Sequence, residues 1–296
     1  MSEPRVRRVL QVIVAALIVL FFALALYDLW PEITAYDWQF EPVYLVGALV
    51  VLVLRGPLPA YGWWAILRHL GHNIPFLRSI RIVYYSGMAA FLPGSVWHAV
   101  GRVYLAEREG VPRMSAAVSV VLETVLILLS ALVVGSLSLV AWPDPPWSAV
   151  AGGAAVLLVV LLWPDLMFRI ANRVLSAFGR RTIDVRLSTV DLLKLMWPFV
   201  LGWLVFGVIF QLIVMSLYPS LGIKYLPLVT GIFTAAWVGG YLAVVVPQGW
   251  GVREFIIVTL LAVVGVPAPV ATAAALLARL ASMLGVALWG LISIRL

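Results

Sequence analysis

The sequence contains no cysteine and only three histidines in 296 residues. The absence of cysteine excludes disulfides, thiolate chemistry and cysteine-ligated metal sites. The histidines (His69, His72 and His98) form no HExxH or comparable ligand pattern, so the sequence does not indicate a zinc enzyme. We therefore expect neither a metal ion nor another cofactor.

Charged residues are also scarce, at 11% of the chain, whereas a soluble domain carries about a quarter. Hydrophobic residues make up 64%, the mean hydropathy is +1.09, and long apolar runs recur from end to end. The chain has too few charges to cover a soluble surface, and it lacks the short alternating segments of a membrane β-barrel. The composition predicts an all-α polytopic membrane protein with one integral membrane domain over residues 1–296.

The net charge is +7, and most of the positive charge is arginine beside apolar segments. This placement is typical of residues that orient membrane segments and contact anionic lipids. We expect membrane lipids as partners and no nucleic acid.

Six apolar runs are predicted to cross the membrane fully. The run that begins at Pro42 ends either near Leu54 or after “GWWAILRHLG”. The other five runs cover residues 9–29, 113–141, 147–163, 190–217 and 268–293.

Two further segments, 79–109 and 226–264, are interrupted by proline and glycine. We predict that each is a re-entrant helical hairpin, which enters and leaves the membrane on the same side. The basic linker 164–189 is predicted to be amphipathic and to lie along the membrane interface.

The distribution of basic residues predicts how the spans are oriented. With six spans and two re-entrant hairpins, most Lys and Arg residues fall at the termini and in three loops on one side. These loops are 55–81, 102–113 and 164–194, whereas the opposite loops carry mainly acidic residues. Because basic residues favour the cytoplasmic side, we predict a multi-pass protein of the cell membrane with both termini in the cytoplasm.

The two interrupted segments resemble each other. In both, a proline-containing loop is followed by a short helix, a Gly-Val-Pro turn and a long span. Gly110 of the first turn corresponds to Gly265 of the second, an offset of 155 residues (265 − 110). Chance similarity of small apolar residues is the alternative. Three predicted spans (113–141, 147–163 and 190–217) separate the two interrupted segments. Because this number is odd, we predict that the units, about 79–141 and 226–293, form an inverted repeat, which is typical of transporters.

The loop “PQGWG” interrupts the second segment. Pro247 ends a helix because it lacks an N–H group and clashes with the preceding turn. Gly249 and Gly251 permit a tight turn and close approach of a ligand, and Gln248 and Trp250 lie beside them. The short helix that begins near Gly251 has unpaired N–H groups at its start, which favour an anion.

The first segment has a similar loop. Pro93 and Gly94 interrupt it, and a helix opens near Ser95. His98 and Arg102 follow at one-turn intervals, so the three polar side chains share a face and would line one side of a headgroup pocket. The alternatives are that Arg102 extends to the cytoplasmic interface and that His98 is a packed, hydrogen-bonded histidine.

Two charges lie well inside predicted spans, where an unpaired charge costs about 2.5–3.5 kcal/mol. Glu123 either completes the pocket, binds a coupling proton or positions an arginine, or it forms a structural ion pair with Arg102 or Arg253. Arg279 lies one position beyond the repeat equivalent of Glu123. We therefore expect Glu123 and Arg279 to face one central cavity.

Arg253 and Glu254 fall in the first turn of the second short helix. Glu254 suits the helix dipole, and its alternative role is a simple cap. Arg253 opposes the dipole, so an anion or a carboxylate should compensate its charge. Trp97 and Trp250 lie in the loops and are expected either to wall a lipid path or to anchor the chain at the interface.

These residues resemble the transmembrane region of the lysylphosphatidylglycerol synthase family, a flippase-like domain. The likeness lies in “LPGSVWHAVGRVYL” and “SVVLETVL”, and in “PQGWGVREFIIVTLL” and “ALLARL”. Thr124 stands where the family pattern has arginine, and the first loop is one residue longer. The positions that match the pattern are Pro93, Gly94, Arg102, Glu123, Gly249, Gly251, Arg253, Glu254 and Arg279.

The resemblance covers most of the chain. It implies movement of a phospholipid or a polyprenyl-phosphate-linked lipid between membrane leaflets. No aminoacyltransferase domain is expected in this chain, so synthesis of a modified lipid would need a separate enzyme.

We therefore predict a lipid flippase-like transporter that binds an anionic headgroup between the two re-entrant units. The alternatives are an integral-membrane lipid-phosphate transferase, with His98 or Glu123 as base, and a membrane partner or anchor for a separate glycosyltransferase or aminoacyltransferase. Gly285 and Gly290 permit close helix packing and leave a homo-oligomer open. The predicted substrate-binding residues are Pro93, Gly94, Ser95, Trp97, His98, Arg102, Glu123, Gln248, Gly249, Trp250, Gly251, Arg253, Glu254 and Arg279.

Overall fold

The computed structural model describes residues 31, 34–89, 97–162, 188–243 and 249–295. Within these ranges the regular structure is helical, as predicted, and no strand is present. The α-helices are α2 (Pro42–Arg55), α3 (Pro57–His69), α4 (Phe76–Met88), α5 (Trp97–Arg108), α6 (Arg113–Leu139), α7 (Trp147–Leu162), α9 (Thr189–Leu217), α10 (Leu226–Leu242), α11 (Val252–Val263) and α12 (Ala268–Ser293). Two 3₁₀ turns, η2 (Pro219–Leu221) and η3 (Ile223–Tyr225), precede α10.

Five stretches of the described chain are long and apolar enough to cross a membrane, so the protein is a multi-pass membrane protein. They are Pro42–His69, Arg113–Leu139, Thr189–Leu217, Ile223–Leu242 and Ala268–Ser293.

The predicted count of six full spans stays a prediction. The predicted span 9–29 and nearly all of the linker 164–189 lie outside the described residues. The predicted span 147–163 is the 16-residue helix α7. One arm of the predicted second hairpin, Ile223–Leu242, is itself long enough to span.

The first described span continues through a break in its hydrogen bonding. Gly56 joins α2 to α3 in helical conformation (φ −50°, ψ −43°), so the run from Pro42 extends to the longer of its two predicted ends. Pro57 has no N–H to donate to the carbonyl of Val53. That carbonyl accepts from the Gly56 N–H at 3.1 Å and from the indole N–H of Trp289 on α12 at 3.0 Å. The break therefore brings the end of α2 against α12.

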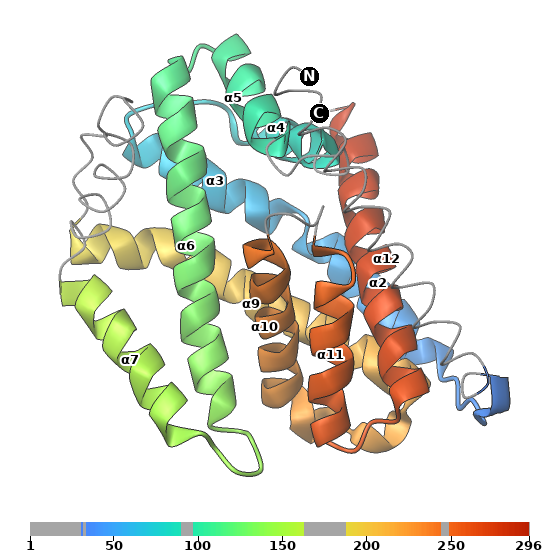
Figure 1. Ribbon diagram of the computed structural model, residues 1–296. Coiled ribbons are helices and arrows are strands. Elements are labelled where there is room, and N and C mark those ends of the chain that lie inside the picture. The colour runs from blue at the N-terminus through green and yellow to red at the C-terminus, as the bar shows by residue number, and fades with distance from the viewer. Residues whose placement is uncertain (1–30, 32–33, 90–96, 163–187, 244–248, 296) are drawn as a thin grey trace, which may run out of the picture.

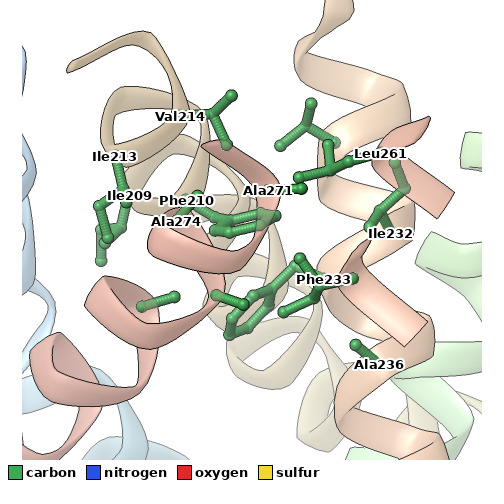
Figure 2. Packing of buried hydrophobic residues seen from close by; sticks show 14 of the residues in the cluster. Ile209, Phe210, Ile213, Val214, Ile232, Phe233, Ala236, Leu261, Ala271 and Ala274 are labelled. Atoms are coloured by element: carbon green, nitrogen blue, oxygen red, sulfur yellow. The ribbon is translucent and has the colours of Figure 1, made fainter. Parts of the chain in front are cut away.

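Helix α9 is the centre of the packing and contacts α2, α3, α6, α7, α10 and α12. The largest core cluster lies where α9 meets α10, α11 and α12 (Figure 2). There the rings of Phe210 and Phe233 lie with centroids 5.4 Å apart. Ala271 and Ala274 of α12 are fully buried beside them, because small side chains let the helices approach closely.

Helices α11 and α12 begin at the positions of α5 and α6 shifted by 155 residues. Adding 155 to the bounds of α5 moves 97–108 to 252–263, the bounds of α11, and moves the start of α6 from 113 to 268, the start of α12. The turns also match, since Gly110 has φ +84° and Gly265 has φ +78°. The residue after each glycine, Val111 or Val266, donates its N–H five residues back, at 3.1 and 3.2 Å.

The two sets of helices, α4–α6 and α10–α12, lie with opposite directions in the molecule. In Figure 1, α6 begins at the upper end beside α4 and α5, whereas α12 begins at the lower end, from which α10 and α11 extend inward. Each set also packs on the other. Helix α4 contacts α12, and helix α10 contacts α6. The first helix of each set therefore lies against the long last helix of the other.

Candidate functional site

A cavity of about 290 Å³ lies among α2, α4, α5, α9, α10, α11 and α12. Most of its wall is apolar or aromatic. Its charged wall residues are Arg55, Arg253, Glu254 and Arg279.

The start of α11 builds one side of the cavity. Gly251, the N-cap, has φ +79°, a conformation that favours glycine. The carboxylate of Glu254 turns back and accepts the Gly251 backbone N–H at 2.7 Å. Its other oxygen accepts from Nε of Arg279 in an ion pair. Glu254 therefore caps α11, which was the alternative role predicted for it. It also binds Arg279 of α12.

Arg253 lies between two helices. Its guanidinium lies over the ring of Trp237 on α10, 5.3 Å from the centroid, and its Nε is buried without a hydrogen-bond partner. A Cβ atom at Gly240 would lie 2.4 Å from Cγ of Arg253, so α10 has room for this side chain only because residue 240 is glycine. Gly249 lies equally close to α10, since a Cβ atom placed on it would be 2.4 Å from Cα of Gly240.

Arg279 enters the cavity from α12. Its guanidinium pairs with Glu254 and lies 4.6 Å from the centroid of the Trp250 ring. Its Nη2 is buried and has no hydrogen-bond partner among the residues that the structure describes. One nitrogen of this arginine is therefore used by the fold, and another is left available.

Arg55 is the charged wall residue of the cavity that sequence reasoning missed. It was placed in the basic loop 55–81, but it ends α2 at the break beside Gly56. Its guanidinium lies 4.2 Å from the centroid of the Phe206 ring, and its Nε is buried without a partner. The available signal was an arginine followed by Gly-Pro in the middle of a long apolar run.

The predicted charges of the first unit lie elsewhere. Arg102 and Glu123 are 7% and 8% exposed and form an ion pair between α5 and α6. Arg102 also donates from Nε to Ser86 Oγ at 3.1 Å, and its guanidinium lies 5.7 Å from the ring of Trp63. Trp63 is itself fixed by donating to Ser119 Oγ at 3.0 Å. The structural ion pair with Arg102 is one of the two pairings that were the alternative prediction for Glu123.

The structure therefore brings part of the predicted site together. Arg279 lines the cavity, but Glu123 and Arg102 do not. His98 reaches the cavity from α5, and Trp97 beside it is 46% exposed. Four predicted residues lie outside the described part of the chain: Pro93, Gly94, Ser95 and Gln248.

The cavity is suited to an anion. Guanidinium nitrogens that are buried without an acceptor are costly, and the cost is removed when an anion supplies oxygens. Among the described residues, no group of three or more His, Cys, Asp or Glu side chains is placed to hold a metal ion. The arrangement can bind and orient a negatively charged group.

A second, apolar groove shares Arg55 with the cavity as a wall residue. It has a volume of about 540 Å³ and lies among α2, α3, α4 and α9. Its wall is formed by Val51, Leu54, Arg55, Pro57, Leu58, Tyr61, Phe76, Trp197, Leu201 and Val205. Arg55 thus belongs to the walls of both spaces, one charged and the other hydrophobic.

The family model described as lysylphosphatidylglycerol synthase TM region matches residues 8–290. The chain belongs to this family. The resemblance carried by the two Pro/Gly loops is thereby confirmed, and the match includes every charged residue of the cavity. No curated protein matches the chain.

Proposed function

We propose that this member of the lysylphosphatidylglycerol synthase TM region family is a flippase-like lipid transporter. It moves an anionic phospholipid or a polyprenyl-phosphate-linked lipid across the cell membrane. The observation that carries the proposal is the cavity itself, where Arg55, Arg253 and Arg279 each hold a buried nitrogen that has no acceptor among the described residues. The lipid phosphate supplies the missing acceptors.

The apolar groove favours a lipid over a soluble anion. A lipid has a charged head and a hydrocarbon tail, and Arg55 lies where a charged space meets an apolar one. The head binds in the cavity while the tail leaves through the groove toward the bilayer. A soluble anion would have no use for the second space.

We infer that the units 79–141 and 226–293 form an inverted repeat with two re-entrant hairpins. The shared helix bounds, the matched glycine turns and the opposite directions of α6 and α12 support this inference. In transporters of this kind the substrate binds between the repeats and access alternates between the two sides. With both termini in the cytoplasm, the headgroup crosses between α11–α12 and the α4–α5 hairpin.

The transferase alternative gains no support from the site. Of its two candidate bases, Glu123 is held by Arg102 outside the cavity. His98, the other candidate, lines the cavity wall, and Glu123 is not there to act with it.

Transport in proteoliposomes tests the proposal, with fluorescent phosphatidylglycerol, phosphatidic acid and polyprenyl phosphate as substrates. Arg253→Gln should slow transport about tenfold or more, because a charge-assisted hydrogen bond contributes about 1.5–3 kcal/mol. Arg68→Gln is the matched control, since Arg68 is an exposed arginine that lies outside the cavity wall. It should transport at the wild-type rate.

Two results would reject the transporter. One is that wild-type protein moves none of the three lipids. The other is that folded Arg253→Gln protein matches the wild-type rate. Co-purification of an inactive chain with a glycosyltransferase would then favour the anchor alternative.

A further inference from the structure

The charges of the cavity do not balance. Three arginines and one glutamate line it, which leaves two positive charges (3 − 1 = 2). Residues 90–96 and 244–248, which lie outside the described part of the chain, contain no charged residue. The nearby pair of Arg102 and Glu123 is neutral as a unit and lies outside the wall.

The unpartnered donors come from three different helices. They are Nε of Arg55 on α2, Nε of Arg253 on α11 and Nη2 of Arg279 on α12. Each guanidinium is held from one face by an aromatic ring, namely Phe206, Trp237 and Trp250 in turn. The rings restrict the arginines, and Glu254 restricts Arg279 further. The donors are therefore preorganised.

Phosphate esters differ in two properties that matter for binding in this cavity, namely their charge and the number of their terminal oxygens. A phosphate monoester carries a charge of about −1.5 to −2 at pH 7 and has three terminal oxygens as acceptors. A phosphate diester carries a single negative charge and has only two non-bridging oxygens. One diester would leave a positive charge uncompensated, which is costly in a buried site.

We propose that the cavity selects a terminal, doubly charged phosphate, as in a lipid phosphate monoester, over a phosphodiester headgroup. The inference rests on the proposed function for the lipid nature of the ligand. Arg55 determines the selectivity, because it supplies the second uncompensated charge and the third donor, at the boundary with the apolar groove.

Binding to the purified full chain in nanodiscs tests this inference. Phosphatidic acid and phosphatidylglycerol with identical acyl chains are compared by competition against fluorescent phosphatidic acid. Wild-type protein should prefer phosphatidic acid by about tenfold or more, the effect of one added charge-assisted hydrogen bond. Polyprenyl phosphate should compete as phosphatidic acid does, because its terminal phosphate is the same.

Variants at residue 55 separate charge from shape. Arg55→Gln removes one positive charge and should reduce the preference to about threefold or less, mainly by weakening phosphatidic acid binding. Arg55→Lys keeps the charge and should retain most of the preference. Arg68→Gln removes a cation outside the cavity and should leave the preference at its wild-type value.

The source of the phosphate is tested in the same assay. Inorganic phosphate and glycerol 3-phosphate carry the same terminal group without a tail, so they should fail to displace the lipid at equal concentration. Displacement by either one would overturn the lipid assignment.

Two outcomes separate this inference from the proposed function. If wild-type protein binds both phospholipids equally and Arg253→Gln weakens both, the transporter proposal stands and the selectivity is overturned. If none of phosphatidic acid, phosphatidylglycerol and polyprenyl phosphate binds, the proposed function fails as well. The wild-type comparison needs no variant, so the inference stays testable even if Arg55→Gln does not fold.

Discussion

The two units that we propose as an inverted repeat carry the same kind of ion pair with opposite polarity. In the first unit the arginine, Arg102, lies on the short helix α5 and the carboxylate, Glu123, lies on the long helix α6. In the second unit Glu254 lies on the short helix α11 and Arg279 lies on the long helix α12. Both pairs join a short helix to a long one, yet only the second lines the cavity.

The difference lies in how completely each pair is satisfied. Arg102 has Glu123, Ser86 and the ring of Trp63 as partners, and no atom of this pair is buried without a hydrogen bond. In the second unit Glu254 divides its oxygens between Gly251 and Arg279, and a nitrogen of Arg279 remains unpartnered. One geometry thus serves as a structural clamp in the first unit and as a binding wall in the second.

The largest expected effect comes from breaking the clamp. Glu123→Gln should destabilise the protein by about 3–5 kcal/mol, because it leaves the buried Arg102 cation without a counter-charge. Thermal unfolding in detergent measures the loss. The double variant Arg102→Met/Glu123→Met should recover most of it, since apolar pairs often replace a buried ion pair without cost.

The exposed ion pair between Arg78 and Glu109 gives the control for the clamp, because Arg78 is 56% exposed. Arg78→Gln should cost about 1 kcal/mol or less. Equal losses for Glu123→Gln and Arg78→Gln would contradict the structural role of the buried pair.

The same substitution in the second unit should have a smaller effect. Glu254→Gln keeps an amide oxygen that can accept the Gly251 N–H, and Arg279 borders a cavity where a ligand anion can neutralise it. The expected loss is about 1–3 kcal/mol. Adding an anionic lipid should recover part of it in Glu254→Gln but none in Glu123→Gln. A loss larger than that of Glu123→Gln would reverse the assignment of clamp and binding wall.

The smallest effect should be equal in the two units. Gly110→Ala and Gly265→Ala each place a side chain at positive φ, where no neighbouring atom lies within 4 Å of the new Cβ. Only backbone strain is introduced, so each should cost about 1–2 kcal/mol. Gly135→Ala, at an open helical position of α6, is the matched control and should be neutral or stabilising. Clearly unequal losses at residues 110 and 265 would break the correspondence of the turns.

Much of the architecture could be read from the order of residues. Long apolar runs placed the spans, and the Gly-Val-Pro turns placed the starts of α6 and α12, because proline and glycine act on the backbone within a few residues. Glu254 could likewise be expected to cap α11, since a capping contact spans one turn. Each of these features depends on local physical chemistry.

The membership of the site depended on packing. Arg55 could not be assigned from sequence, because the same pattern of arginine after an apolar run also marks a cytoplasmic boundary. Arg55 lies in the cavity wall beside the junction of α2 and α3, where Trp289 of α12 donates to the Val53 carbonyl. Nothing within one turn of Arg55 specifies this contact.

The sequence by itself determined that this is a helical membrane protein of one family, with charges that cannot stay unpaired in hydrocarbon. Only the tertiary structure decided that Glu123 pairs with Arg102 while Glu254 pairs with Arg279 beside Arg253. The physical reason is range. Hydrophobicity and backbone preferences act along neighbouring residues, whereas the partner of a buried charge is set by which helices pack together.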